Sequence, residues 1–150
     1  MILKEITLLT LEEYLENTLF VSSINKFWWL KTPRPHINGA VYAINDENTV
    51  DFVSAFNVAI GVRPVCVFDI SPSNPLFWCK PGKVMGSKIK YGKYTWTVFD
   101  ISNNELRTLC DVAIVDHCFD SYDSNSNKWE VSELKRWLET EGIKLIDGLE

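Results

Sequence analysis

The residues of this chain that could do chemistry are few, and their spacing does not form a catalytic set. His117 lies between Asp116 and Cys118, but side chains that are neighbours in a strand point to opposite faces. No Ser-His-Asp order stands out, and no Cys-x-x-Cys pair is present. The four cysteines, which we interpret as reduced structural thiols, are Cys66, Cys79, Cys110 and Cys118. We therefore expect no catalytic residue, no cofactor and no metal site.

The segment 123–127 has the polar start of a calcium-binding loop. Such a loop requires glycine at its sixth position and glutamate at its twelfth. This chain has Lys128 and Leu134 there. We interpret the segment as a solvated loop before the last helix, and calcium binding is the alternative.

Trp28 and Trp29 form an adjacent tryptophan pair that is followed by Pro33. In a strand the two rings point to opposite faces, so at least one is expected in the core. The other has two possible roles. It packs in the core as well, or it forms an exposed platform for a ligand or partner.

Arg63 occupies the third position of the segment Gly61-Val62-Arg63-Pro64. The proline restricts the backbone that precedes it. We expect the guanidinium to pair with a carboxylate and to tie loops together as a structural anchor. Binding of an anion or small ligand by Arg63, in a receptor or an enzyme, is the alternative.

Two polar loops are the remaining candidates for contact with a partner, namely 33–39 and 116–123. The candidate partner-binding residues, with the tryptophan pair included, are Trp28, Trp29, Arg34, His36, Asp116, Asp120 and Asp123.

Local patterns indicate the elements that position these residues in the first half. Thr10 and Glu13 have the spacing of a capping box, which predicts a short helix ending near residues 17–18. Strands are predicted over 26–30, 39–44, 49–56 and 61–68. A hairpin turn is predicted at 45–48.

The second half follows the clearest linker of the chain, which is rich in proline and serine. We predict a single domain over 1–150 with sub-halves 1–70 and 83–150 joined by the linker 71–82. A tight hairpin is predicted over 88–99 and a strand over 107–115. A last helix is predicted over 128–140 with Gly142 as its stop. Its apolar stripe consists of Val131, Leu134, Trp137 and Leu138.

Composition excludes several classes of partner. The 150 residues are 46% hydrophobic and carry a net charge of −5, so no general nucleic-acid or anionic-membrane surface is expected. No segment approaches the roughly 18 apolar residues that a membrane span requires. Lys4 and Glu5 interrupt the first apolar run, which predicts no signal peptide.

As a set, the motifs resemble a bacterial and phage domain of unknown function, the DUF6273 type. Its members carry Trp-Trp-Leu-Arg-Ser-Pro and, further on, Gly-Val-Arg-Pro-Ala. Residues 28–33, 41–43 and 61–65 are similar to this half of the domain. Residues 88–98 and 129–138 resemble its hairpin and its helix, which usually come first. The chain therefore resembles a circularly permuted member of the family.

The resemblance implies a C-type-lectin-like scaffold, which also hosts formylglycine-generating enzymes. The expected fold is α+β, with small twisted antiparallel sheets and two helices in a single compact domain. Cys110 and Cys118 do not match the reactive cysteine motif of those enzymes.

A phage or prophage origin is also implied, and with it the cytoplasm of a bacterial host. Our leading interpretation is a non-enzymatic protein-binding module whose partner is another protein. It could be an inhibitor of a host defence system, such as an anti-CRISPR protein. A structural virion accessory protein is the alternative, and the oligomeric state stays open.

Overall fold

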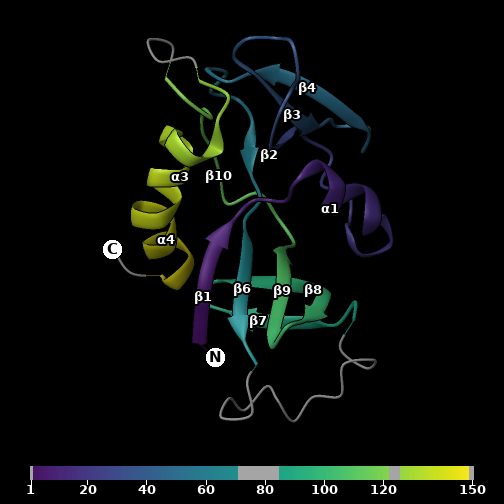
Figure 1. The fold of residues 1–150 in the computed structure, drawn as a ribbon. Coiled ribbons are helices and arrows are strands. Elements are labelled where there is room, and N and C mark those ends of the chain that lie inside the picture. The colour runs from purple at the N-terminus through teal and green to yellow at the C-terminus, as the bar shows by residue number, and fades with distance from the viewer. Residues whose placement is uncertain (1, 71–84, 122–125, 149–150) are drawn as a thin grey trace.

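Two five-stranded sheets form the framework of the protein. The computed structural model describes residues 2–70, 85–121 and 126–148, so the predicted linker 71–82, Cys79 and Asp123 lie outside the described residues. The lower sheet of Figure 1 has the order β1 (Ile2–Thr7), β6 (Val65–Asp69), β9 (Glu105–Cys110), β8 (Tyr94–Ser102), β7 (Lys88–Tyr91). The upper sheet has the order β10 (Val115–Asp116), β5 (Gly61–Val62), β2 (Trp28–Pro33), β3 (Ala40–Ile44), β4 (Val50–Ser54).

The sheets are antiparallel except at one pair. β2 runs parallel to β5, with Trp28 opposite Gly61. Register shifts interrupt β1, β2 and β8, and such bulges bend and twist a strand. The result is an α+β fold built mostly from curled antiparallel sheets. Both sheets contain strands of both sub-halves, since β6 pairs with β9 and β5 pairs with β10.

Two helical regions flank the sheets on opposite sides (Figure 1). α1 (Leu11–Glu16) begins at Thr10, whose hydroxyl accepts from Glu13 N while the Glu13 side chain accepts from Thr10 N. A 3-10 turn, η1 (Thr18–Phe20), follows. The C-terminal region comprises η3 (Trp129–Val131), α3 (Glu133–Trp137), a wide π turn η4 (Leu138–Gly142) and α4 (Ile143–Asp147). None of the helices in the described ranges is long and apolar enough to cross a membrane.

The C-terminal helix corrects two sequence predictions. Ser132 caps α3, so the helix starts later than predicted, and Val131 lies exposed in the 3-10 turn rather than in the apolar stripe. Gly142 is a buried residue inside the helix, and the αL residue Gly148 ends it. A Cβ at Gly142 would lie 2.9 Å from a Leu138 methyl and 3.1 Å from the Trp137 ring. That glycine therefore serves close packing rather than termination.

Two predicted strands are each divided between the sheets. The predicted strand 61–68 breaks at Arg63-Pro64, because proline has no N–H for a ladder and restricts the preceding residue. The predicted strand 107–115 breaks after Cys110. The chain therefore crosses from one sheet to the other at 63–64 and again at 111–114. These two crossing segments run side by side, since Cys110 N donates to Pro64 O at 2.9 Å and Ile114 N donates to Val62 O at 2.9 Å.

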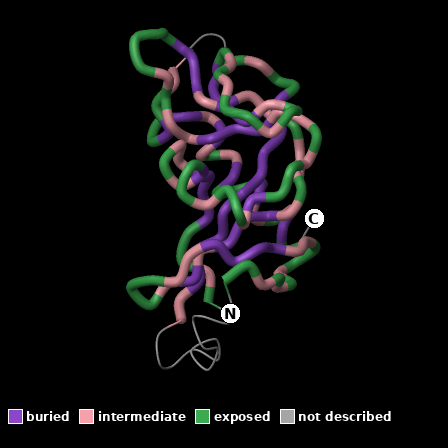
Figure 2. Tube along the Cα trace, turned by 90° about the vertical axis from the view of Figure 1, so that its right-hand side faces the viewer, coloured by how far each residue is buried: buried purple, intermediate pink, exposed green. Residues whose placement is uncertain are grey.

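The buried residues form two clusters, one on each side of the sheets. The first includes Trp29, Phe68 and Trp96 together with Leu134 and Leu138 of the C-terminal helix. The second includes Trp28, Val65 and Phe99 together with Leu9 and Tyr14 at α1. The buried residues run through the centre of the molecule, and the exposed ones lie at its periphery (Figure 2).

Candidate functional site

The tryptophan pair belongs to the core, which corrects its candidacy as a contact surface. Trp28 and Trp29 are both fully buried. Trp28 packs edge-on against Tyr14, with ring centroids 6.0 Å apart. Trp29 packs against Phe119 at 5.6 Å, and its Nε1 donates to His117 O at 2.8 Å. Of the two roles considered from the sequence, core packing therefore holds for both rings.

Arg63 lies at the point where the two chain crossings meet. It is 1% exposed. Its Nε donates to Cys110 O at 2.7 Å, and its terminal nitrogens donate to Ser22 O at 2.7 Å and Ser22 Oγ at 2.8 Å. Its guanidinium carbon stands 4.9 Å from the centre of the Trp28 ring.

Burial lowers the pKa of Arg63 to about 10, partly offset by the charge of Asp111. The partners are carbonyls and a hydroxyl rather than the carboxylate expected from the sequence. A guanidinium enclosed in this way can tie chain segments together but cannot receive an anion from solvent.

In the polar loop 116–123, Asp120 is buried whereas Asp116 is exposed. Asp120 is 2% exposed, and its carboxylate accepts from Ser126 N at 2.9 Å and Glu133 N at 3.2 Å. Its candidacy as a partner-binding residue is therefore wrong, because it holds the chain before α3. Asp116 is exposed and forms an ion pair with Lys26.

The His117 ring is held by packing and by a main-chain carbonyl. It packs on Trp137 with centroids 5.1 Å apart, and its Nδ1 lies 2.7 Å from Cys118 O. Burial raises the pKa of the Cys118 thiol, followed in effect by the charge of Glu133. Burial and the Glu133 charge both disfavour a reactive Cys118 thiolate at neutral pH.

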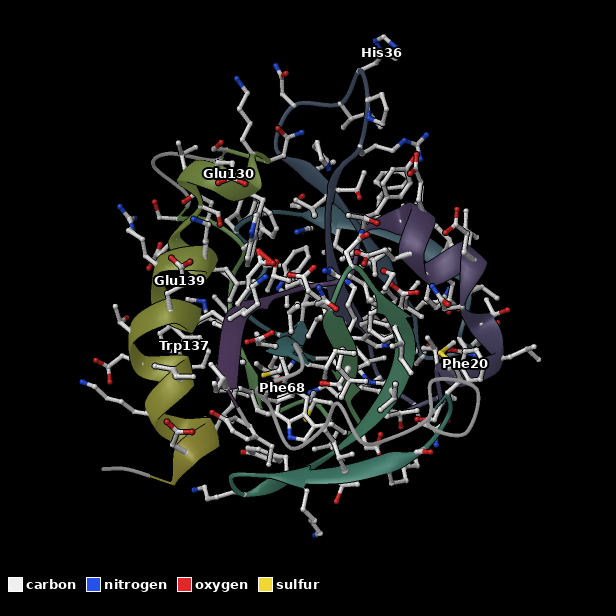
Figure 3. The ribbon with its side chains drawn as sticks, turned by 60° about the horizontal axis from the view of Figure 1, so that its bottom comes forward. Phe20, His36, Phe68, Glu130, Trp137 and Glu139 are labelled. Atoms are coloured by element: carbon white, nitrogen blue, oxygen red, sulfur yellow. The ribbon has the colours of Figure 1, made fainter. Side chains whose placement is uncertain are left out.

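The loop between β2 and β3 carries Arg34 and His36 to one end of the molecule. His36 stands at the outer tip of this loop and points away from the fold (Figure 3). The Arg34 guanidinium carbon lies 4.4 Å from the centre of the Phe52 ring and 5.7 Å from that of Tyr42. Asn127 reaches the same end, where its Nδ2 donates to Ala40 O at 3.1 Å. Arg34 thus contacts β4 through Phe52, whereas His36 stands apart at the loop tip.

β4 is one of the two edge strands of the upper sheet, and its hydrogen-bond register determines which main-chain groups face outward. Asn45 N donates to Thr49 O at 2.9 Å and Ala55 N donates to Gly39 O at 2.7 Å. Because hydrogen-bonded and non-hydrogen-bonded pairs alternate in an antiparallel ladder, residues 51 and 53 bond to β3. The main-chain groups of Val50, Phe52 and Ser54 therefore face away from the sheet.

β4 exposes two large apolar side chains beside this edge. Val50 is 39% exposed and Phe52 is 42% exposed. Asp51 Oδ1 accepts from Phe52 N at 2.8 Å. Exposed edges with apolar side chains are templates for pairing with a further strand.

A groove of about 450 Å³ runs beside β4 on the face opposite Phe52. It lies between the β3–β4 hairpin and the crossing segment that leads from β4 to β5. Its lining consists of Asn25, Lys26, Phe27, Asp46, Val53, Asn57, Ala59 and Ile60. Phe27 and Val53 pack against the core cluster of Trp29 and form part of an apolar floor. The groove and the β4 edge together form the candidate site.

Lys88, Thr97 and Asp111 form a polar cluster on the lower sheet that was not expected from the sequence. Lys88 Nζ donates to Thr97 Oγ at 2.6 Å and to Asp111 Oδ2 at 2.9 Å, and Thr97 Oγ donates to Asp111 Oδ1 at 2.5 Å. The Thr97 hydroxyl thus bonds to both members of the Lys88–Asp111 ion pair. The cluster therefore links β7, β8 and the end of β9.

Sequence reasoning did not identify Asp51, Phe52 or Val53 as site residues. The sequence contained an indication of an edge strand here, because strand 49–56 has no continuous apolar face. Mixed faces are typical of an edge strand, which packs less of its surface than a central strand.

Comparison of the chain with protein-family models, with curated proteins and with solved structures finds no match. Within the described ranges, no group of three His, Cys, Asp or Glu side chains could hold a metal ion.

Proposed function

We propose that this protein is a non-enzymatic protein-binding module that adds an extended segment of its partner to the edge of β4. The observation that carries the proposal is the outward-facing main-chain groups of β4, among them Val50 N, Phe52 O and Ser54 N, beside exposed apolar side chains. Two further outward groups already have partners within the chain, since Phe52 N donates to Asp51 Oδ1 and Ser54 O accepts from Asn57 N. In β-augmentation the main-chain hydrogen bonds supply affinity and flanking pockets supply specificity. Arg34 over Phe52 on one face and the groove on the other supply such flanks.

The biological setting of the proposal rests on the motif resemblance alone. We propose a permuted C-type-lectin-like scaffold of the DUF6273 type, encoded by a phage or prophage and acting in the bacterial cytoplasm. Inhibition of a host defence system, such as an anti-CRISPR role, fits a small binding module. The geometry supports binding to a protein without naming the partner.

A proline variant tests the edge directly. Ser54→Pro removes an outward N–H while leaving the bonds to β3, and proline is tolerated on edge strands for this reason. The matched control is Lys90→Pro on β7, an edge strand of the lower sheet. Tyr91 and Tyr94 flank a two-residue turn, so Lys90 also faces outward.

Each variant serves as bait in a bacterial lysate. We expect a partner retained by the wild type and by Lys90→Pro but lost with Ser54→Pro, and slower amide exchange at Val50 and Ser54 in the complex. Equal retention by both variants would contradict the proposal.

A structural virion accessory protein is the alternative, and it makes a different prediction. Self-pairing of β4 edges would give a dimer or a longer assembly of this chain. Light scattering coupled to size exclusion distinguishes the two, because the binding module is expected as a monomer before its partner is added.

A further inference from the structure

We infer that the groove beside β4 selects partner strands that carry a basic residue and a large apolar residue two positions apart. The inference rests on the proposed function, because it assumes that the partner pairs with β4. Side chains alternate between the two faces of a strand, so Asp51 and Val53 share one face and Phe52 lies on the other. Val53 lines the groove, which places Asp51 on the groove face too.

The apolar half of the pattern follows from the groove floor. Phe27, Val53 and Ile60 line it together with Ala59. Its volume of about 450 Å³ falls in the range of ligand pockets and accommodates a leucine, methionine or aromatic side chain. An added strand places one side chain opposite Val53 and on the same face. That side chain is the one that enters the groove.

The basic half of the pattern follows from the charges around the groove. Asp46 lines it, and Asp51 lies on the same face of β4. The ammonium of Lys26 contacts Asp116, so this cation is already matched by an anion. The groove side therefore has an excess of carboxylates. A lysine or arginine opposite Asp51 complements them.

The same charges disfavour a second copy of this chain as the occupant. Antiparallel pairing of two β4 strands about a two-fold axis places both Asp51 side chains on one face of the joined sheet. It also brings each copy's Asp46 to that face. Like charges across paired strands are destabilising, whereas a basic strand from another protein removes the repulsion.

The experiment selects displayed random nine-residue peptides on the immobilised full chain. We expect enriched peptides to have Lys or Arg at one position and a large apolar residue two positions away. Fluorescein-labelled synthetic peptides with Lys-x-Leu and Glu-x-Leu at these positions then give the Kd by anisotropy. Asp51→Lys should weaken the Lys-x-Leu peptide about two- to fivefold and strengthen the Glu-x-Leu peptide by a similar factor. Ala59→Trp, which fills the groove from an exposed position, should weaken the Lys-x-Leu peptide at least about tenfold.

The outcomes separate this inference from the proposed function. Peptides that lose binding on Ser54→Pro but lack the basic-x-apolar pattern overturn the inference and leave the proposed function standing. Peptides that bind Ser54→Pro as well as the wild type overturn both, and so does a selection without enrichment. A peptide methylated on one edge-facing amide provides a second test of strand addition that leaves the protein unchanged. It should bind at least about tenfold more weakly than its unmethylated form, because it loses one main-chain hydrogen bond and leaves a carbonyl without its donor.

Discussion

Arg63 illustrates how one side chain can hold a fold together where secondary structure stops. It bonds to Ser22 on one segment and to Cys110 on another, at the place where two strands leave one sheet for the other. Hydrogen bonds to a charged donor are stronger than neutral ones, and buried carbonyls without a partner are costly. The planar fork of arginine serves both segments at once.

Arg63→Lys should therefore lower the free energy of unfolding by about 2–4 kcal/mol, because a lysine ammonium cannot reproduce the three bonds. Urea denaturation measures the change. Arg136→Lys at an exposed position is the control and should stay within about 0.5 kcal/mol of the wild type. A loss of less than about 0.5 kcal/mol for Arg63→Lys would show that the anchor is dispensable.

The raised pKa of Tyr91 should make the free energy of unfolding depend on pH in the alkaline range. Burial, and then the charge of Asp147, raise the pKa of Tyr91 to about 12. An unfolded tyrosine titrates near about 10. Between these values the unfolded chain binds fewer protons than the folded one, so the stabilising contribution is complete below about pH 10 and is lost as pH rises towards 12. Tyr91→Phe removes the phenol and should flatten this part of the curve. Unfolding free energies of both proteins from pH 9 to 12 check the difference, and parallel curves would refute it.

Among the elements, β4 is distinguished by what it leaves exposed. Central strands bury both faces, as β6 does with Cys66 and Phe68 in one cluster and Val65 and Val67 in the other. β4 bonds to one neighbour and presents its outer groups to solvent. Function at this strand therefore depends on its edge rather than on the core that supports it.

The turn between β7 and β8 is the element that receives the C-terminal helix. Gly92 has φ +60, and a Cβ there would lie 2.0 Å from Ile146 O. That carbonyl also accepts from Lys93 N at 2.8 Å. A side chain at Gly92 would separate the helix end from the turn.

Gly92→Ala should cost about 2–4 kcal/mol of unfolding free energy, from the left-handed backbone and the close approach together. Gly86→Ala is the matched control, because Gly86 also has positive φ but a Cβ would meet only the Phe20 ring at 3.3 Å. The control should cost about 1–2 kcal/mol. Thermal or urea unfolding measures both, and equal losses would contradict a specific role for the contact with Ile146.

At the scale of the whole molecule, the two halves of the chain share both sheets and both core clusters. Trp29 of the first half packs with Phe119 of the second, and Val65 shares a cluster with Leu109. Such interleaving favours a single cooperative transition.

Urea unfolding should therefore give the same midpoint by tryptophan fluorescence and by far-UV circular dichroism. Leu134→Ala, a truncation in the cluster of Trp29, should shift both curves together by about 2–5 kcal/mol. Two separate transitions, or a shift of only one probe, would instead indicate that the sub-halves 1–70 and 83–150 unfold independently.

Local elements were predictable from the sequence because their determinants lie within a few residues. The capping box of Thr10 and Glu13 is present as expected. Asn45 closes its predicted turn through its own side chain, which accepts from Glu47 N and Thr49 N. The hairpin at Gly92 also formed where its residue types indicated.

The tertiary structure decided everything that depends on which segments meet. It buried both tryptophans, because sheet faces on both sides of β2 are covered. It turned Asp120 inward, because Ser126 N and Glu133 N required an acceptor. It also left β4 at an edge, since strand order depends on contacts between segments distant in sequence. The sequence by itself determined the turns, caps and apolar content of this protein, whereas the free edge and its groove arise only when the strands have been ordered.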